Sequence, residues 1–205
     1  MSRIGISERP IGTGGLPARL HDGFAMSGTD DFDEFGDSEA RQNMIASRLL
    51  AADELGVRLE IVNGLPIWEA QPLYKHQKAV ERIAQTIRAG DGRPKCSYVH
   101  VMDAYVQFPN GLKRPDISIF CREPTEEEQE NALTLIPEAV VEVVSKGYEA
   151  KDLEIGPPFY LSQGVKDVLV FEPSTLLVLH VKHGGAERMV SPVDIVLQCG
   201  CMVTI

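Results

Sequence analysis

The spacing of apolar residues along the chain alternates between a helical and a strand-like period. From Ser38 to Gly56, apolar residues recur every three or four positions, which predicts an amphipathic helix that Ser38 caps and Gly56 ends. One apolar face also runs through residues 73–89 and predicts a second helix, closed by Gly90. A short third helix is predicted over residues 159–164.

After the first helix, the period of the pattern falls to two. Residues 57–62 and 66–70 read as strands on either side of the pair Asn63-Gly64. An Asn-Gly pair favours a tight hairpin, because both residues accept the positive φ angles that the turn requires. We therefore predict a β-hairpin near the start of the domain.

The remaining strands are predicted in three places. A second hairpin is expected around residues 109–111, between the strand-like runs 97–108 and 112–121. Residues 139–144 are almost entirely valine and alanine and read as a buried strand. From residue 165 to the C-terminus, strand-like runs separated by turn residues predict a series of antiparallel strands.

This order of elements predicts one α/β domain over residues 38–205, with α and β elements around a mixed sheet. The domain has an N-terminal helix, an early β-hairpin and C-terminal antiparallel strands. Residues 1–37 are rich in Gly, Asp and Ser with few large apolar side chains, so we expect a flexible acidic arm there. A chain of 205 residues is long enough to bury one substantial core.

Composition bears on the location of the protein. The apolar runs are too short to span a bilayer, and the N-terminus lacks the apolar core of a secretory signal. We therefore expect a cytoplasmic protein without a membrane partner. The absence of CxxC spacing and the apolar neighbours of the cysteines favour free core thiols over a zinc site or disulfides. The four cysteines are Cys96, Cys121, Cys199 and Cys201.

The net charge of −10 argues at first against a nucleic-acid partner, because affinity for phosphate comes largely from Lys and Arg. The charge is unevenly distributed, however. Residues 1–56 hold ten acids and five bases, whereas residues 75–95 hold six bases and two acids. The basic segment is either the solvated face of the second helix or part of a surface that meets DNA.

Two acidic residues stand in strand-like apolar runs. Asp116 follows Pro115 at the start of one run, and Glu142 has two valines on either side. An ionised carboxylate is almost never buried without a partner, because leaving it unpaired in an apolar interior costs several kcal/mol. Both residues must therefore have a charged, hydrogen-bonding or metal partner, or reach water.

The residues alone leave two explanations open. In the first, Glu142 forms a salt bridge or lies at a sheet edge; the candidate partners are Lys113, Arg114 and Lys151. In the second, Asp116 and Glu142 come from neighbouring strands and hold one divalent cation. Hard carboxylate oxygens suit Mg²⁺ or Mn²⁺ for that purpose.

The chain resembles the Uma-two family of restriction-endonuclease-like proteins, in the PD-(D/E)xK nuclease superfamily. The resemblance is carried by three runs that occur in order, GLKRPDISIF, LIPEAVVEVVS and DLEIGPPFYLSQGV. It extends from about Leu59 to about Lys182 and includes the run RLEIVNG and the pair Pro72 and His76. The ordered combination is more specific than any one of these motifs.

The resemblance implies a restriction-endonuclease-like core, a sheet flanked by helices with the active site at strand ends. It also implies hydrolysis of phosphodiester bonds of DNA with Mg²⁺ or Mn²⁺. Asp116 corresponds to the first acid of the family, Glu142 to the second, and the carbonyl oxygen of Val143 to a further metal ligand. Glu60 and His76 fall at family positions in the same cleft and have supporting roles. His76 also fits a hydrogen-bonded core histidine.

The family lysine is missing from its usual positions. In most nucleases of the superfamily it lies two residues after the second acid, which is Val144 here. The Uma-two family, by resemblance, carries it on the following helix, where this chain has Gly156. Lys151 is the preferred substitute and Lys146 the alternative, because a flexible lysine from either position could reach the metal. Both also fit ordinary solvated loop lysines.

The function predicted on this basis is that of a metal-dependent endonuclease acting on DNA. One alternative is a nuclease fold that retains binding to nucleic acid or protein after losing hydrolysis with the lysine. Another is a hydrolase of a smaller phosphate ester, although the sequence has no Gly-rich phosphate loop of the P-loop kind. A homodimer would suit double-strand cleavage, because one site cuts one strand.

Overall fold

The computed structural model describes residues 34–205 except 70, 91–95 and 130–131. The chain divides into the units Met1–Glu34 and Phe35–Ile205, and the account below concerns the second. Helix α1 spans Glu34–Glu54, so it begins four residues before the predicted Ser38. The rest of the predicted acidic arm lies outside the described residues. No described helix combines the length and the apolar character needed to cross a membrane.

A mixed six-stranded sheet forms the centre of the domain, with the strand order β11-β10-β9-β8-β7-β4. Only β8 and β9 pair in parallel, and the other neighbours are antiparallel. This arrangement confirms the predicted mixed α/β class. The strands are β4 Val99–Met102, β7 Ile117–Phe120, β8 Ala139–Val143, β9 Asp167–Glu172, β10 Leu177–Lys182 and β11 Gly185–Val190.

A second sheet contains the two predicted hairpins in the order β2-β1-β6-β5. In the first hairpin Val62 pairs with Leu65, and the turn residues Asn63 and Gly64 have φ angles of 50° and 78°. The predicted hairpin at Asn63-Gly64 is therefore confirmed. The strands are β1 Leu59–Val62, β2 Leu65–Trp68, β5 Val106–Phe108 and β6 Gly111–Lys113.

The second predicted hairpin is correct at its turn but wrong in its strand lengths. Residues 97–108 and 112–121 each divide between two sheets, because β5 pairs with β6 while β4 pairs with β7. The break lies at Asp103, which has a φ of 57°, and at Arg114 before Pro115. The Arg114 guanidinium donates to Asp103 Oδ2 over 2.9 Å, so the two chain segments bend together.

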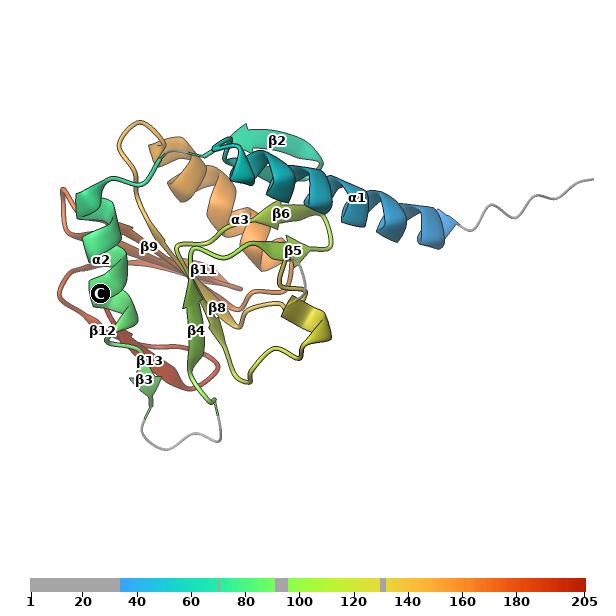
Figure 1. The fold of residues 1–205 in the computed structure, drawn as a ribbon. Helices are drawn as coiled ribbons and strands as arrows, with labels where there is room; N and C mark the ends of the chain where they lie inside the picture. The colour runs from blue at the N-terminus through green and yellow to red at the C-terminus, as the bar shows by residue number, and fades with distance from the viewer. Residues whose placement is uncertain (1–33, 70, 91–95, 130–131) are drawn as a thin grey trace, which may run out of the picture. The chain divides into compact units, whose positions relative to one another are not determined.

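Helix α2 spans Tyr74–Ala84 and ends five residues before the predicted position 89. Residues 88–89 instead form strand β3, in which Ala89 pairs with Cys201 of the C-terminal strand. The Thr86 hydroxyl supports this turn by donating to the Ile83 carbonyl oxygen over 2.7 Å. The third sheet has the order β12-β13-β3 and lies beside α2 (Figure 1). Its strands are β3 Arg88–Ala89, β12 Asp194–Val196 and β13 Cys201–Thr204.

The two helices α2 and α3 cover opposite faces of the central sheet. Residues Val80 and Ile83 of α2 pack in one apolar cluster with Val141 of β8. Tyr160 of α3 packs in another cluster with Val140, the neighbour of Val141 on the same strand. Successive strand residues point to opposite faces, so β8 is buried on both sides. Helix α3 spans Gly156–Ser162, after the π-helical turn η2 (Lys151–Ile155), and the short 3₁₀ helix η1 spans Glu127–Gln129.

Candidate active site

A polar cleft opens where β7 begins and β8 ends. Its empty space, with the open mouth included, measures about 400 Å³. Five of the residues predicted for the site line this cleft, and the sixth, Glu60, is fully buried and bonded to one of them. The five are His76 of α2, Asp116 before β7, Glu142 and Val143 of β8, and Lys151 of η2.

The strand register brings the two acids together. Ile117 of β7 pairs with Val141 of β8, so the preceding Asp116 lies beside the following Glu142. The Asp116 backbone N–H donates to Glu142 Oε2 over 3.3 Å, and the Val143 backbone N–H donates to Asp116 Oδ2 over 2.7 Å. The two carboxylates therefore share one end of the sheet, as the sequence predicts.

His76 Nε2 contacts two oxygens of this group at once. It lies 3.1 Å from Asp116 Oδ2 and 3.0 Å from the carbonyl oxygen of Val143. Both atoms accept hydrogen bonds, so Nε2 carries the proton. Burial lowers the pKa of His76, but the hydrogen bond and charge of Asp116 raise it more, and the net pKa lies above its usual value. The other ring nitrogen, Nδ1, is buried and has no hydrogen-bond partner among the described residues.

The Glu142 carboxyl group is turned toward the protein interior at its other oxygen. The Tyr160 hydroxyl donates to Oε1, and Lys113 Nζ lies 3.9 Å from the same atom. Burial raises the pKa of Glu142 to about 8, because Lys113 offsets only part of the desolvation and Asp116 adds its own negative charge. One oxygen of Glu142 thus faces Lys113 and Tyr160, and the other faces the Asp116 backbone.

The pKa of Glu60, on β1, shifts in the opposite direction to that of Glu142. Its Oε2 lies 3.1 Å from Lys113 Nζ and 2.9 Å from Lys151 Nζ, and the Arg114 backbone N–H donates to Oε1 over 3.0 Å. Burial raises the pKa of Glu60, but the two ammonium groups lower it more, to about 2. Glu60 thus stays ionised and holds both lysines, whereas Glu142 retains a proton near neutral pH.

The two candidate lysines differ in placement. Lys151 is largely buried, lines the cleft and is bound to Glu60, whereas Lys146 is exposed and lies outside the cleft lining. Val144, in the usual lysine position, packs in the apolar cluster of Tyr160 and offers no cation. Gly156 begins helix α3. The structure thus brings Lys151, and not Lys146, to the group of acids.

Comparison with known proteins places the chain in a family. The family model Uma2, described as "Putative restriction endonuclease", matches residues 46–195. The chain belongs to the Uma2 family. This Uma2 protein also resembles a solved structure described as a "putative nuclease belonging to DUF820 from Anabaena variabilis ATCC 29413". The TM-score is 0.52 at 18% identity, covering 68% of this chain and 81% of the other, which shows a shared fold. No curated protein matches.

The sequence of this Uma2 protein did not predict the roles of three residues of the site. Lys113 was predicted only as a possible salt-bridge partner of Glu142. Its fully buried ammonium group lies between Glu60 and Glu142. Tyr160 lies within the matching run DLEIGPPFYLSQGV without a predicted role, yet its hydroxyl donates to Glu142. Glu69 was not singled out, although it lines the cleft and its pKa rises to about 7 through burial and the charge of Glu60. The place of Lys113 beside Glu60 depends on the pairing of β6 with β1, which the sequence does not signal.

The raised pKa of Glu142 predicts a pH-dependent stability. The folded protein keeps this proton to about pH 8, whereas the carboxyl of the unfolded chain loses it near pH 4.5. Stability therefore falls as pH rises through this window, because the folded state binds more protons. We expect Glu142→Gln to be more stable than the wild type at pH 9 by at least about 1.4 kcal/mol, the equivalent of one pKa unit.

Urea unfolding of both proteins at pH 5, 7 and 9 measures this effect, in the absence of divalent metal. The gain should be small at pH 5 and grow toward pH 9. The exposed Glu154, changed to Gln, serves as the matched control and should show no such trend. A gain from Glu142→Gln that is constant across these pH values would contradict the assigned proton.

Proposed function

We propose that this Uma2 protein is a metal-dependent endonuclease that hydrolyses phosphodiester bonds of DNA. Mg²⁺ or Mn²⁺ would be held by Asp116, Glu142 and the carbonyl oxygen of Val143. One observation carries the proposal. Asp116 Oδ2 and the Val143 carbonyl oxygen both lie within 3.1 Å of a single atom, His76 Nε2, so the two oxygens already face one point.

The chemistry of these donors fits a hard divalent cation. All three are oxygens, and two belong to carboxyl groups, the ligand type that Mg²⁺ and Mn²⁺ prefer. The positive edge of the His76 ring lies against two of them, which supports a preference of this point for positive charge. A cation bound there would polarise the phosphate and lower the pKa of a bound water.

The other residues of the site would either neutralise negative charge or hold another side chain in position. Lys151 lines the cleft, and its ammonium would offset the negative charge that develops on the phosphate in the transition state. Glu60 holds that ammonium and the one of Lys113 in place. Tyr160 fixes the orientation of Glu142 by donating to Oε1. Each role follows from a contact with a proposed ligand or with a lysine near it.

The helix that carries His76 supports DNA as the substrate. Three of its bases, Lys75, Lys78 and Arg82, are exposed on α2, whose first turn borders the cleft. Exposed Lys and Arg supply most of the affinity for a phosphate backbone. This local surplus gives an acidic protein a surface that can meet DNA next to the acids.

Nicking of supercoiled plasmid DNA tests the proposal. We expect nicked circles with Mg²⁺ or Mn²⁺ and none after addition of EDTA. Lys151→Met should lower the nicking rate by about 10²- to 10³-fold, the usual loss when one stabilising group is removed. Lys146→Met is the matched control, because this lysine is exposed, and should nick at the wild-type rate. A wild-type nicking rate in Lys151→Met together with a reduced rate in Lys146→Met would contradict the role of Lys151.

A second candidate is a binding module that has lost hydrolysis. It is favoured by Val144 and Gly156, which occupy the two positions where the resemblance implies a lysine. DNA retention in a gel-shift assay, without nicking under any divalent metal, would support this candidate over the endonuclease.

A further inference from the structure

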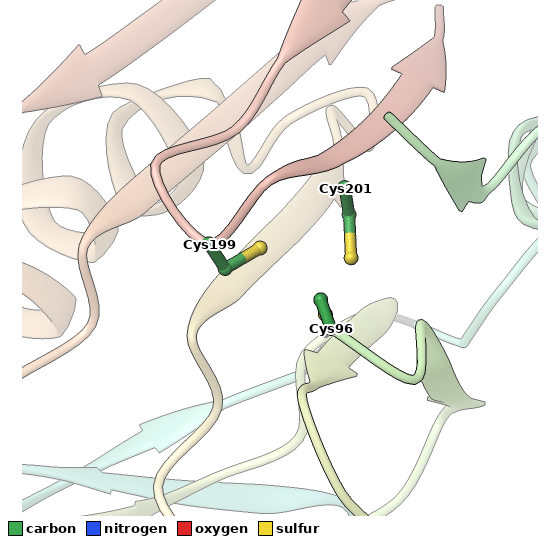
Figure 2. Close-up of side chains that lie close together, drawn as sticks. All are labelled: Cys96, Cys199 and Cys201. Carbon is green, nitrogen blue, oxygen red and sulfur yellow. The ribbon is translucent and has the colours of Figure 1, made fainter. Parts of the chain in front are cut away.

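A second group of reactive side chains lies away from the acidic cleft. All four cysteines are among the described residues and are free thiols. The sulfur atoms of Cys96, Cys199 and Cys201 all lie within 4.8 Å of one another. Figure 2 shows these three side chains gathered between the turn before β13 and the segment that precedes β4. The sequence favours free core thiols over a zinc site, because it has no CxxC spacing and the cysteines have apolar neighbours.

Backbone contacts fix two of these thiols on one turn. Cys199 precedes Gly200, whose φ is 91°, and Cys201 begins β13. The Gly200 N–H donates to the Leu197 carbonyl oxygen over 2.9 Å, and the Leu197 N–H donates to the Cys201 carbonyl oxygen over 2.8 Å. This tight turn presents the Cys-Gly-Cys run toward the central sheet.

The fourth cysteine, Cys121, lies on a segment next to this group. It follows β7 directly, and its carbonyl oxygen accepts a hydrogen bond from the Ser97 N–H over 3.2 Å, which brings the Cys96 segment alongside. The Cys96 thiol donates to the carbonyl oxygen of Phe120 over 3.6 Å, so its sulfur lies beside the residue that precedes Cys121.

We propose that Cys96, Cys199 and Cys201 form a structural zinc site and that the neighbouring Cys121 supplies its fourth thiolate. Thiolates are the soft ligands that Zn²⁺ takes in tetrahedral Cys₄ sites, with Zn–S distances of about 2.3 Å. That distance corresponds to sulfur separations of about 3.8 Å in a tetrahedron. The three sulfurs lie within 4.8 Å of one another, so small side-chain movements would close the site.

The thiol site is separate from the acidic cleft in position and in chemistry. Asp116 precedes β7 and Cys121 follows it, so the two groups lie at opposite ends of this strand. The cleft offers oxygen donors, whereas this group offers sulfur. A bound Zn²⁺ would join the β12–β13 turn to β7 and to the start of β4, and would stabilise the fold rather than take part in hydrolysis.

Co²⁺ titration of the full-length wild-type protein, reduced and stripped of metal, tests the proposal. We expect an intense thiolate charge-transfer band and the visible bands of tetrahedral coordination, and the charge-transfer band should saturate at one thiolate-bound Co²⁺ per chain. Zn²⁺ should displace the Co²⁺ and raise the melting temperature. A reduced, folded wild-type protein that develops no charge-transfer band would overturn the proposal, and so would rapid formation of a disulfide in place of metal binding.

Single substitutions identify the ligands. Cys96→Ser, Cys199→Ser and Cys121→Ser should each weaken Zn²⁺ binding by more than about 100-fold, because losing a ligand exceeds the 10- to 100-fold loss typical of outer-shell partners. Wild-type affinity in any of the three variants would refute the four-thiol site. Asp116→Asn, which alters the cleft alone, should leave the cobalt band unchanged. Loss of the band in a folded Asp116→Asn protein would contradict the independence of the thiol site from the cleft.

Discussion

Asp116→Asn will lower the rate of plasmid nicking by at least about 10³-fold and leave the fold intact. The substitution removes the negative charge of a proposed metal ligand, and loss of one preorganised electrostatic group alone costs about 10²- to 10³-fold. The shape of the side chain is kept. The amide oxygen can still accept the hydrogen bond that the Val143 N–H donates to Asp116 Oδ2 over 2.7 Å. The variant therefore separates chemistry from folding.

The control for this variant is Asp194→Asn. Asp194 is exposed on the third sheet, where it accepts hydrogen bonds from Arg88 and Thr204, and it lies outside the cleft lining. Its amide variant should nick DNA at the wild-type rate. Circular dichroism and urea unfolding should show both variants folded. Wild-type nicking by a folded Asp116→Asn protein would remove Asp116 from the mechanism.

Glu60→Gln should lower the free energy of unfolding at pH 7 by about 3 to 5 kcal/mol. Glu60 is fully buried and accepts contacts from the ammonium groups of Lys113 and Lys151 at 3.1 and 2.9 Å. Removing one partner of a buried ion pair leaves an uncompensated charge, and here two lysines lose their nearest anion. Both lysines are also poorly hydrated, with side chains 1% and 13% exposed.

The pH dependence of this loss provides a second test. Glu60 has a pKa of about 2 in the folded protein against 4.5 ordinarily, so its ionised form stabilises the fold above pH 4.5. That contribution disappears as pH falls from 4.5 toward 2. The difference in free energy of unfolding between the wild type and Glu60→Gln should therefore become smaller as the pH falls. Glu81→Gln, which breaks only the exposed Lys78–Glu81 pair, should cost less than about 0.5 kcal/mol at any of these pH values.

A cost of Glu60→Gln no larger than that of Glu81→Gln would show that the two buried lysines find other partners. In that case Glu60 would not be the residue that holds Lys151 at the cleft.

The features of the fold that the sequence predicts are those with local signals. Asn63-Gly64 marks its hairpin because the turn needs two residues that accept positive φ angles, and both angles are positive in the structure. The end of α2 had no such signal. Ile87 continues the apolar helical spacing beyond Ala84, and residues 88–89 are strand only through pairing with Cys201 and Met202, more than a hundred residues later.

The residues of the site also divide into those with a local signal in the sequence and those without one. Asp116 and Glu142 are conspicuous because each interrupts an apolar run, and a buried carboxylate requires a partner. The role of Lys113 depends on β6 lying beside β1, where Ile61 pairs with Leu112. Similarly, the thiols of Cys96 and Cys199 meet only once β4 and the β12–β13 turn are placed. Pairing between distant segments is fixed by the whole core and leaves no pattern in any one of them.

The most direct test of the account is the anomalous scattering of Mn²⁺ in a crystal of the full-length protein. We predict a manganese peak within coordination distance of an Asp116 carboxylate oxygen, a Glu142 carboxylate oxygen and the Val143 carbonyl oxygen. A manganese peak only at another place in the crystal would contradict the proposed metal site. So would the absence of manganese from a soaked crystal in which His76 Nε2 still contacts Asp116 and Val143.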